Sequence, residues 1–268
     1  KCYTRDFKKG EYTDDTILTL ALAESIVERR GLDLEDIARK QLIEYEKRIL
    51  PDGRVFGGFG GTTMDAFKNL QKGMSPLHSG VIGGPGNAPA MKMSPMGLYM
   101  DSKDNYEEGI LFSEKVGKIT HLDPRSIASG VVHAHCIYSL LNDVTRKEFI
   151  DSAVDVCKRF ESPVTKEFNL SKSGSLLSRL EWINDNMEVT DEEAFKKLGA
   201  TSLVFRSYPF ALFMFQKHWD DPIEGLVETV NYGGDCDTTG AIYGTLAGAK
   251  NGMIFPEEWE VNNLDSMV

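Results

Sequence analysis

Residues 233–252 read GGDCDTTGAIYGTLAGAKNG, and this stretch predicts a helix that starts directly after two aspartates, Asp235 and Asp237. Glycine recurs at every fourth position, which places four glycines on one face of a helix over 238–252. The four are Gly240, Gly244, Gly248 and Gly252. Each costs about 1 kcal/mol relative to alanine inside a helix, so we expect tight packing against another helix to compensate. A membrane dimer is disfavoured because the segment is short and contains Lys250.

Helical periodicity extends outward from this segment over most of the chain. An acidic stretch, Thr13-Asp14-Asp15-Thr16, precedes an apolar helical pattern at 16–30. Further helices are expected at 34–50, 63–71, 91–100, 106–119, 124–142, 145–160, 172–186, 191–198, 202–217 and 222–231. The sequence contains no convincing strand pair and no repeat of fixed period. We therefore predict an all-α fold that forms a single domain over residues 1–268.

The acidic composition limits the classes of partner. The 268 residues carry 30 Lys and Arg against 41 Asp and Glu, a formal net charge of −11. This balance disfavours DNA and RNA as partners, because nucleic-acid phosphates are bound by Lys and Arg. A hydrophobic content of 41% argues against disorder. No uninterrupted apolar run is long enough to span a membrane, so a membrane partner is not expected.

The cysteines and the start of the chain bear on its location. The four scattered cysteines, Cys2, Cys136, Cys157 and Cys236, form neither a CxxC pair nor a zinc-ligand spacing. We therefore expect a reducing, cytoplasmic location rather than a disulfide-rich secreted protein. The chain begins at Lys1 without a Met and in the middle of a pattern, so we expect a further N-terminal segment to precede it.

Residues 51–90 are rich in glycine and proline and contain only one short helical pattern. A connection of this length inside one domain is usually functional. The segment Gly83-Gly84-Pro85-Gly86-Asn87-Ala88 exposes backbone N–H groups that are able to hold an anion such as a phosphate. It is not a Walker loop, because no Gly-Lys-Ser/Thr follows, and a flexible loop is the competing interpretation.

Two acidic clusters, at 13–16 and 235–238, stand at helix starts far apart in the sequence. Taken singly, each is explained by capping, since Asp and Thr satisfy free N–H groups there. Taken together, four carboxylates and two hydroxyls converge if the two helices pack side by side. Carboxylates brought close together repel, so they either take up protons or hold cations. Ligand sets made only of oxygen favour a hard cation such as Mg²⁺, Mn²⁺ or Ca²⁺.

Other catalytic signals are weaker. The sequence has no Gly-x-Ser-x-Gly elbow and no evident Cys/His dyad, so a covalent nucleophile is not indicated. His121 lies between two helical patterns, where interaction with a helix C-terminus is the simplest role.

Four sequence blocks together resemble the ADP-ribosylglycohydrolase family. In chain order they are Gly10-Glu11-Tyr12-Thr13-Asp14-Asp15-Thr16; Gly60-Gly61-Thr62-Thr63 with Gly83-Gly84-Pro85-Gly86-Asn87-Ala88-Pro89-Ala90-Met91-Lys92; Ile119-Thr120-His121-Leu122-Asp123-Pro124; and Gly233-Gly234-Asp235-Cys236-Asp237-Thr238-Thr239-Gly240-Ala241-Ile242. The first and last blocks are the specific ones, and together the blocks span nearly the whole chain. The resemblance implies a compact orthogonal helix bundle of the family's type. It also implies hydrolysis of the bond between the anomeric carbon of ADP-ribose and a side-chain acceptor.

The resemblance also implies roles for individual residues. It implies a binuclear Mg²⁺ centre, with Mn²⁺ as the other candidate, whose ligands are Thr13, Asp14, Asp15, Asp235, Asp237 and Thr238. It implies a cleft for ADP-ribose lined by Gly84, Gly86, Asn87, Ala88, Met91 and His121. The implied catalytic residues are Asp14, Asp15 and Asp235, of which one accepts a proton from the attacking water. The implied partners are an ADP-ribosylated protein as substrate and ADP-ribose as product.

The chain departs from the family pattern in several places, among them its start, Asn87-Ala88-Pro89 in place of Asn-Gly-Ala, Lys92, and Cys236 in place of Thr. The family's opening helix would precede Lys1. Lys92 stands where many relatives have Arg, and a lysine offers a point charge in place of arginine's bidentate fork.

Two alternatives stay open at this stage. One is a non-catalytic relative that binds ADP-ribose or serves a structural, crystallin-like role, although such a protein has no need to keep four converging acids. The other is a Mg²⁺-dependent phosphohydrolase that cleaves the diphosphate of a nucleotide and therefore releases different products. The acceptor side chain, whether arginine, serine or another, is not predictable from spacing.

Overall fold

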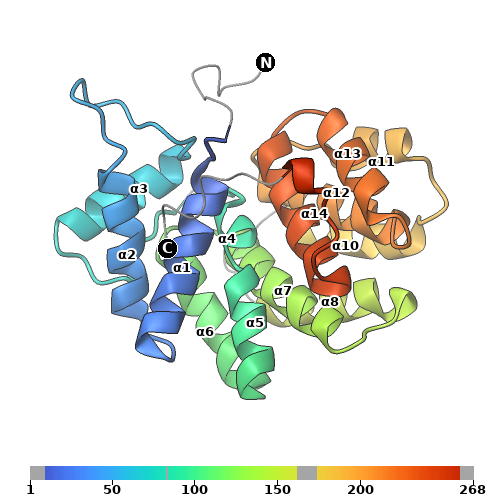
Figure 1. Cartoon of the computed structure of the whole chain (residues 1–268), viewed down its shortest axis with the longest axis horizontal. Coiled ribbons are helices and arrows are strands. Elements are labelled where there is room, and N and C mark those ends of the chain that lie inside the picture. The colour runs from blue at the N-terminus through green and yellow to red at the C-terminus, as the bar shows by residue number, and fades with distance from the viewer. Residues whose placement is uncertain (1–9, 83, 162–173, 260–268) are drawn as a thin grey trace.

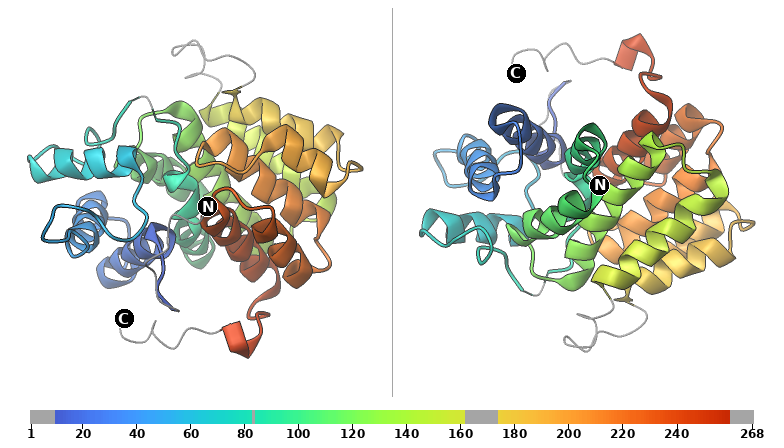
Figure 2. Two further views of the ribbon diagram at one scale, coloured as in Figure 1. Left: turned by 90° about the horizontal axis from the view of Figure 1, so that it is seen from above. Right: turned by 90° about the horizontal axis from the view of Figure 1, so that it is seen from below.

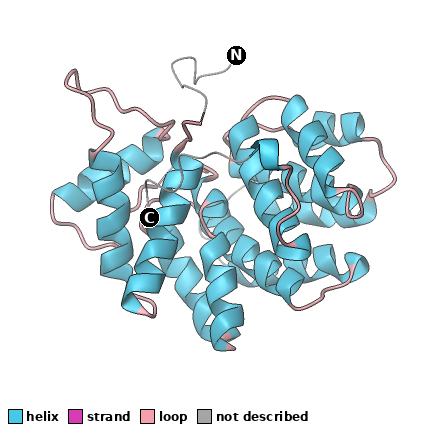
Figure 3. Ribbon diagram, in the orientation of Figure 1, coloured by secondary structure: helices cyan, strands magenta, loops and turns pink. Residues whose placement is uncertain are grey.

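The computed structural model describes residues 10–82, 84–161 and 174–259, and the secondary structure of this part is almost entirely helical (Figures 1 and 3). Its α-helices are α1 (Asp14–Arg29), α2 (Leu34–Glu46), α3 (Gly61–Gln71), α4 (Ala88–Met91), α5 (Ser94–Lys103), α6 (Tyr106–Lys118), α7 (Pro124–Leu141), α8 (Arg146–Phe160), α10 (Leu176–Asp185), α11 (Asp191–Leu198), α12 (Val204–Lys217), α13 (Pro222–Asn231) and α14 (Cys236–Asn251). A short 3₁₀ helix, η2 (Glu257–Trp259), follows them. The predicted all-α fold is confirmed.

Helix α7 organises the packing. Figures 1 and 2 show it between α1–α6 on one side of the molecule and α8 with α10–α14 on the other. Most of its side chains are buried, and it packs against α4, α5, α6, α8 and α14. Helix α5 approaches it closely at Gly97, where an added Cβ would lie 2.5 Å from Ile137 Cβ. A larger residue at Gly97 would therefore push the two helices apart.

The apolar side chains form clusters on both sides of α7. The largest joins α7, α8, α10, α12 and α14, and it includes Phe149 and Phe215, whose ring centroids lie 5.3 Å apart. The other two clusters lie among α1–α7. Because both halves share α7, the described helices form one domain rather than two.

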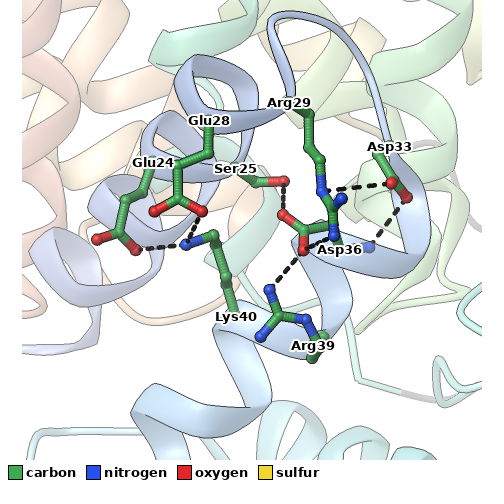
Figure 4. A network of polar contacts seen from close by, with 8 residues as sticks. All are labelled: Glu24, Ser25, Glu28, Arg29, Asp33, Asp36, Arg39 and Lys40. Atoms are coloured by element: carbon green, nitrogen blue, oxygen red, sulfur yellow. Dashed lines mark hydrogen bonds and ion pairs between the residues drawn. The ribbon is translucent and has the colours of Figure 1, made fainter.

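A polar network joins α1 to α2 (Figure 4). Asp36 is buried and accepts hydrogen bonds at 2.7 Å from both Ser25 Oγ and Arg29 Nη2. The Arg29 guanidinium holds the pKa of Asp36 well below its ordinary value. Lys40 pairs with Glu24 and Glu28 on the α1 side. The network fixes how α1 lies against α2, and thereby positions the acidic start of α1.

Helix ends differ from the sequence prediction in two informative places. Helix α2 stops at Glu46 rather than at 50, because the chain turns back and residues Ile49 and Val55 form an isolated antiparallel bridge. The predicted helix at 91–100 is instead two helices, α4 and α5, with Pro95 in the first turn of α5. Proline is favoured in a first turn, where its missing N–H is not needed.

The glycine stripe of α14 does not pack as predicted. Gly240 does meet another helix, since an added Cβ would lie 2.9 Å from Val230 Cγ1 of α13. Gly244 and Gly248 have no described atom within 4 Å of such a Cβ. The expectation of tight packing along the whole stripe is therefore wrong for the part of the chain that the structure describes. Spacing placed these glycines on one face of a helix, but it did not say whether a neighbour covers that face.

None of the described helices combines the length and the apolar composition that a membrane crossing requires.

Candidate functional site

A cleft of about 230 Å³ lies where the N-terminal ends of helices meet. Its walls include the first residues of α1, α3, α4 and α14, and the residues that lead into α12. The start of a helix carries unpaired N–H groups and the positive end of the helix dipole. Five such ends therefore give the cleft an electropositive backbone, which suits an anionic ligand.

The two acidic clusters do come together in this cleft. Asp14 and Asp15 are buried at the start of α1, Asp235 is half-buried, and Asp237 is exposed. Asp14, Asp15, Asp235 and Asp237 all line the cleft, together with the buried Thr238. Thr13 stands just outside it and donates a hydrogen bond to Asp15 Oδ2 at 2.9 Å. The six residues implied as metal ligands thus form one continuous group.

Helix capping does not account for these side chains. Ten of the described helices have Ser, Thr, Asp or Asn at the N-cap, and in seven of them that side chain accepts a backbone N–H. The three that make no side-chain cap are Thr13, Asn87 and Asp235. All three lie at the cleft or touch a residue that lines it. The capping interpretation of the two acidic clusters therefore fails at their N-cap residues.

Asn87 is used to hold Asp235 instead. Its Nδ2 donates to Asp235 Oδ2 at 2.6 Å and to Ser207 Oγ at 3.1 Å, which ties the start of α4 to α14 and α12. Because this bond fixes Oδ2 of Asp235, the protein rather than solvent sets the direction in which Oδ1 points.

The electrostatics of the cluster are those of crowded acids. Burial, with Asp15 and Asp237 nearby, raises the pKa of Asp14 well above its ordinary value. Burial and then the charge of Asp237 raise the pKa of Asp15 to about 7. Burial likewise raises the pKa of Asp235. Folding therefore brings together acids that resist ionisation unless a positive charge joins them.

The oxygen atoms of this group are of the type that a hard cation binds. Asp15 Oδ1 is buried and has no hydrogen-bond partner among the described residues, so this oxygen is available to a ligand. Carboxylate and hydroxyl oxygens are the ligands that Mg²⁺ and Mn²⁺ prefer. In the described ranges no three His, Cys, Asp or Glu side chains are yet drawn together closely enough to hold an ion.

The glycine loop forms the opposite wall and is pinned at several points. Pro85 O accepts the N–H of Val204 at 2.8 Å, and Ser126 Oγ donates to Gly86 O at 2.7 Å. A Cβ at Gly84 would collide with Thr62 Oγ1, and one at Gly86 would lie 2.6 Å from His121 Nε2. The loop is thus held in place, contrary to the flexible-loop interpretation. Gly83 of the same motif lies outside the described residues.

His121 faces the cleft rather than a helix terminus. Its ring is buried, and burial together with the charge of Lys92 lowers its pKa to about 3. The imidazole is therefore neutral across the physiological range of pH. The expected interaction with a helix C-terminus is replaced by a hydrogen bond to Thr120 Oγ1 at 3.0 Å.

Every residue implied as lining the ADP-ribose cleft does line this one: Gly84, Gly86, Asn87, Ala88, Met91 and His121. Sequence reasoning did not single out Gly58, Ser202 and Leu203, which also line it. Leu203 reaches the site through a bridge with Gly86, and Ser202 precedes it. Neither belongs to a chemical motif, so only the three-dimensional fold could reveal them.

Comparisons with known proteins also indicate the ADP-ribosylglycohydrolase family. The sequence pattern of the ADP-ribosylglycohydrolase family matches residues 2–266. The chain is 25% identical over 256 residues to the uncharacterized protein YegU of Escherichia coli, covering 94% of this chain and 74% of YegU. It is 26% identical over 278 residues to the ADP-ribosylhydrolase ARH3 of Mus musculus, covering 93% of this chain and 72% of ARH3. A solved structure titled ADP-ribosylglycohydrolase-related protein complex superposes with a TM-score of 0.68 at 23% identity, over 96% of this chain and 78% of that one.

Proposed function

The chain belongs to the ADP-ribosylglycohydrolase family and is a glycosidase-type hydrolase, and from this premise we propose that it removes ADP-ribose from modified protein side chains with the help of Mg²⁺. The bond cleaved is the N- or O-glycosidic bond at the anomeric carbon of the distal ribose. Relatives named ADP-ribosylhydrolases support hydrolysis of an ADP-ribosyl bond.

The main support for the proposal is that three N-cap residues whose side chains accept no backbone N–H of their own helix converge on one cleft. Thr13, Asn87 and Asp235 belong to three helices separated widely in the sequence, and each makes contacts at the cleft in place of the usual backbone bond. A missing cap costs about 1 kcal/mol, so three omissions at one site favour a function for these side chains.

The cleft also suits the diphosphate of ADP-ribose. Helix α3 begins at the cleft with Gly60 and Gly61, beside which an added Cβ would meet no described atom within 4 Å. Its first turn contains no acidic residue, so its free N–H groups are not neutralised there. Phosphate groups bind favourably at such helix starts. We expect the acids on one wall to face the ribose and the N–H groups on the other to face the phosphates.

The residues that would hold two Mg²⁺ ions are Thr13, Asp14, Asp15, Asp235, Asp237 and Thr238. When bound, these ions would supply positive charge that binds and orients ribose hydroxyls and lowers the pKa of a bound water.

The side chains themselves account for the remaining steps. An aspartate of the cluster, Asp14, Asp15 or Asp235, accepts a proton from the attacking water. The water oxygen forms a bond to the anomeric carbon while the bond to the protein's acceptor atom breaks. The acceptor leaves with a proton, and the ribose leaves with a hydroxyl group. Asn87 keeps Asp235 oriented through its 2.6 Å hydrogen bond while this occurs.

The substitution Asp235→Asn tests this proposal. It should lower the release of ADP-ribose by at least about 100-fold, because even residues that only orient metal ligands contribute 10- to 100-fold. Helix content by circular dichroism should be unchanged. The matched control is Asp221→Asn, at the N-cap of α13, where the side chain only caps Glu224 N–H and asparagine caps equally well.

Undiminished release by Asp235→Asn would refute the assigned role. If wild type binds ADP-ribose but releases none from any modified protein, the chain is a non-catalytic binder instead. Release of AMP with ribose phosphate would favour the phosphohydrolase alternative.

A further inference from the structure

A buried lysine lies behind the histidine wall of the cleft. Lys92 follows α4 and is fully buried, whereas Ala88 and Met91 of α4 line the cleft. Burial lowers the pKa of Lys92 to about 7. Lysine is rarely buried without a specific partner, because removing its ammonium group from water is costly. None of the steps proposed above uses this side chain.

Lys92 begins a chain of hydrogen bonds that ends in the cleft. Its Nζ lies 3.1 Å from Gln41 Oε1 and 3.3 Å from Thr120 Oγ1. Thr120 Oγ1 in turn lies 3.0 Å from His121 Nδ1. Thr120 and His121 are both buried, so solvent does not compete for these bonds.

Counting protons along this chain fixes the tautomer of His121. The Lys92 amine donates to Thr120 Oγ1, which therefore acts as the acceptor in that bond. The single hydroxyl proton of Thr120 is then free to donate, and among the described residues its other hydrogen-bond partner is His121 Nδ1. If Nδ1–H donated to the second lone pair of Oγ1, the buried hydroxyl proton would have no partner among the described residues, which is costly. Nδ1 therefore accepts that proton and carries none itself. In a neutral imidazole the proton is then on Nε2.

Nε2 is the ring atom of His121 nearest Gly86, and both residues line the cleft. It lies beside the Cα of Gly86, and it makes no hydrogen bond with any described residue. The hydrogen bond from Thr120 to Nδ1 therefore sets both the orientation and the tautomer of the His121 ring, while Nε2 stays available to a ligand. We propose that Lys92 and Thr120 are positioning residues that hold His121 as its Nε2–H tautomer, so that it donates a hydrogen bond to an oxygen of ADP-ribose. The identity of this ligand rests on the proposed function, whereas the tautomer does not.

The tautomer is measured directly by long-range ¹H–¹⁵N NMR on protein labelled at histidine, without any ligand. Wild type should show His121 as the Nε2–H form alone. Lys92→Met keeps the length of the side chain and removes the charged donor that shares Thr120 Oγ1 with the imidazole, so the repulsion that disfavours an Nδ1–H donor at the same oxygen is lost. A second tautomer of His121 should then appear. Methionine keeps the volume of the side chain but leaves Gln41 Oε1 without its partner, so circular dichroism checks that the variant folds.

The consequence for binding is measured by titrating ADP-ribose calorimetrically. Lys92→Met and Thr120→Val should each weaken binding roughly 2- to 12-fold, the range that one net hydrogen bond contributes. Thr120→Ser keeps the hydroxyl group and should retain both the wild-type tautomer and the wild-type affinity. Loss of the hydroxyl and loss of the lysine should not add, because both act through the same imidazole.

Wild-type His121 found as the Nδ1–H form, or as a mixture, would overturn the proposal. So would an unchanged tautomer in Lys92→Met combined with unchanged affinity. If wild type shows the Nε2–H form but does not bind ADP-ribose, the positioning role stands and the proposed function fails. The two failures are therefore distinguishable.

Discussion

Asp14 and Asp15 show at the scale of single residues how this fold holds charge. Both are buried, and both have a pKa raised by burial and by neighbouring carboxylates. Asp36, only a few helical turns away, is equally buried but lies against Arg29, which holds its pKa below the ordinary value. The difference is the presence of a protein cation. Asp14 and Asp15 are therefore the acids for which an external cation would relieve the most repulsion.

This contrast predicts a dependence of stability on pH. With its pKa at about 7, folded Asp15 binds more protons than the unfolded chain, whose aspartates titrate near 3.8. The stability that this proton provides is full below pH 3.8 and is lost as pH rises through about 7. In EDTA, raising the pH from 5 to 8 should lower the Tm of wild type by roughly 8 °C more than that of Asp15→Asn, which corresponds to about 2–3 kcal/mol. This is because the two pH units between 5 and a pKa of about 7 each contribute about 1.4 kcal/mol.

Thermal melts in EDTA at several pH values check this expectation, and Asp221→Asn serves as the control that should keep the wild-type slope. Adding Mg²⁺ at pH 8 should raise the Tm of wild type, because a ligand that binds only the native state stabilises it. Equal slopes for wild type and Asp15→Asn would show that Asp15 is not protonated in the folded protein.

The residue types at the site were predictable from the sequence, but their protonation states and tautomers were not. Aspartate, threonine and glycine in motifs indicated oxygen ligands and a loop near an anion. The pKa of Asp15 and the tautomer of His121 depend on Asp237, Thr120 and Lys92, whose distances only the folded chain sets. Ser202 carries no local signal at all.

At the scale of helices, periodicity and start signals predicted type and order well. Most helices that begin with a capping side chain start close to the predicted residue, as does α8 with its Thr145 and Glu148 capping box. The exception is the helix predicted at 172–186: α10 starts at Leu176 after its Ser175 cap, and residues 172 and 173 lie outside the described ones. Errors arose where tertiary contacts decide, as at the end of α2 and in the division between α4 and α5. The glycine stripe of α14 shows the same limit, since the spacing predicts which residues share a helix face but not which helix packs against that face.

The open part of this stripe predicts the effect of a substitution. Gly244→Ala should stabilise the protein by about 1 kcal/mol, because alanine favours the helix and its Cβ meets no described atom. Gly97→Ala is the matched contrast: its Cβ would lie 2.5 Å from Ile137 Cβ, so about 1–3 kcal/mol of destabilisation is expected. Urea unfolding of both variants measures the two signs. Destabilisation by Gly244→Ala would mean that another segment or molecule covers this face.

At the scale of the whole molecule, the site exists because distant helix starts meet. α1 and α14 stand at opposite ends of the described chain, yet both present their first turns to one cleft. The sequence allowed this convergence without requiring it, since helix order does not fix which ends face each other. Packing around α7 brings them together, and the α1–α2 network positions the first of them.

The most direct test of the central claim is the release of ADP-ribose from arginine- and serine-ADP-ribosylated proteins, measured by chromatography with Mg²⁺ and with EDTA. Free ADP-ribose should appear from one of the two substrates in Mg²⁺, disappear in EDTA and return when Mg²⁺ is added in excess. The substrate that is cleaved also names the acceptor side chain. Release that EDTA does not affect would contradict the metal-assisted site, and absence of release from both substrates would contradict arginine and serine as the acceptors.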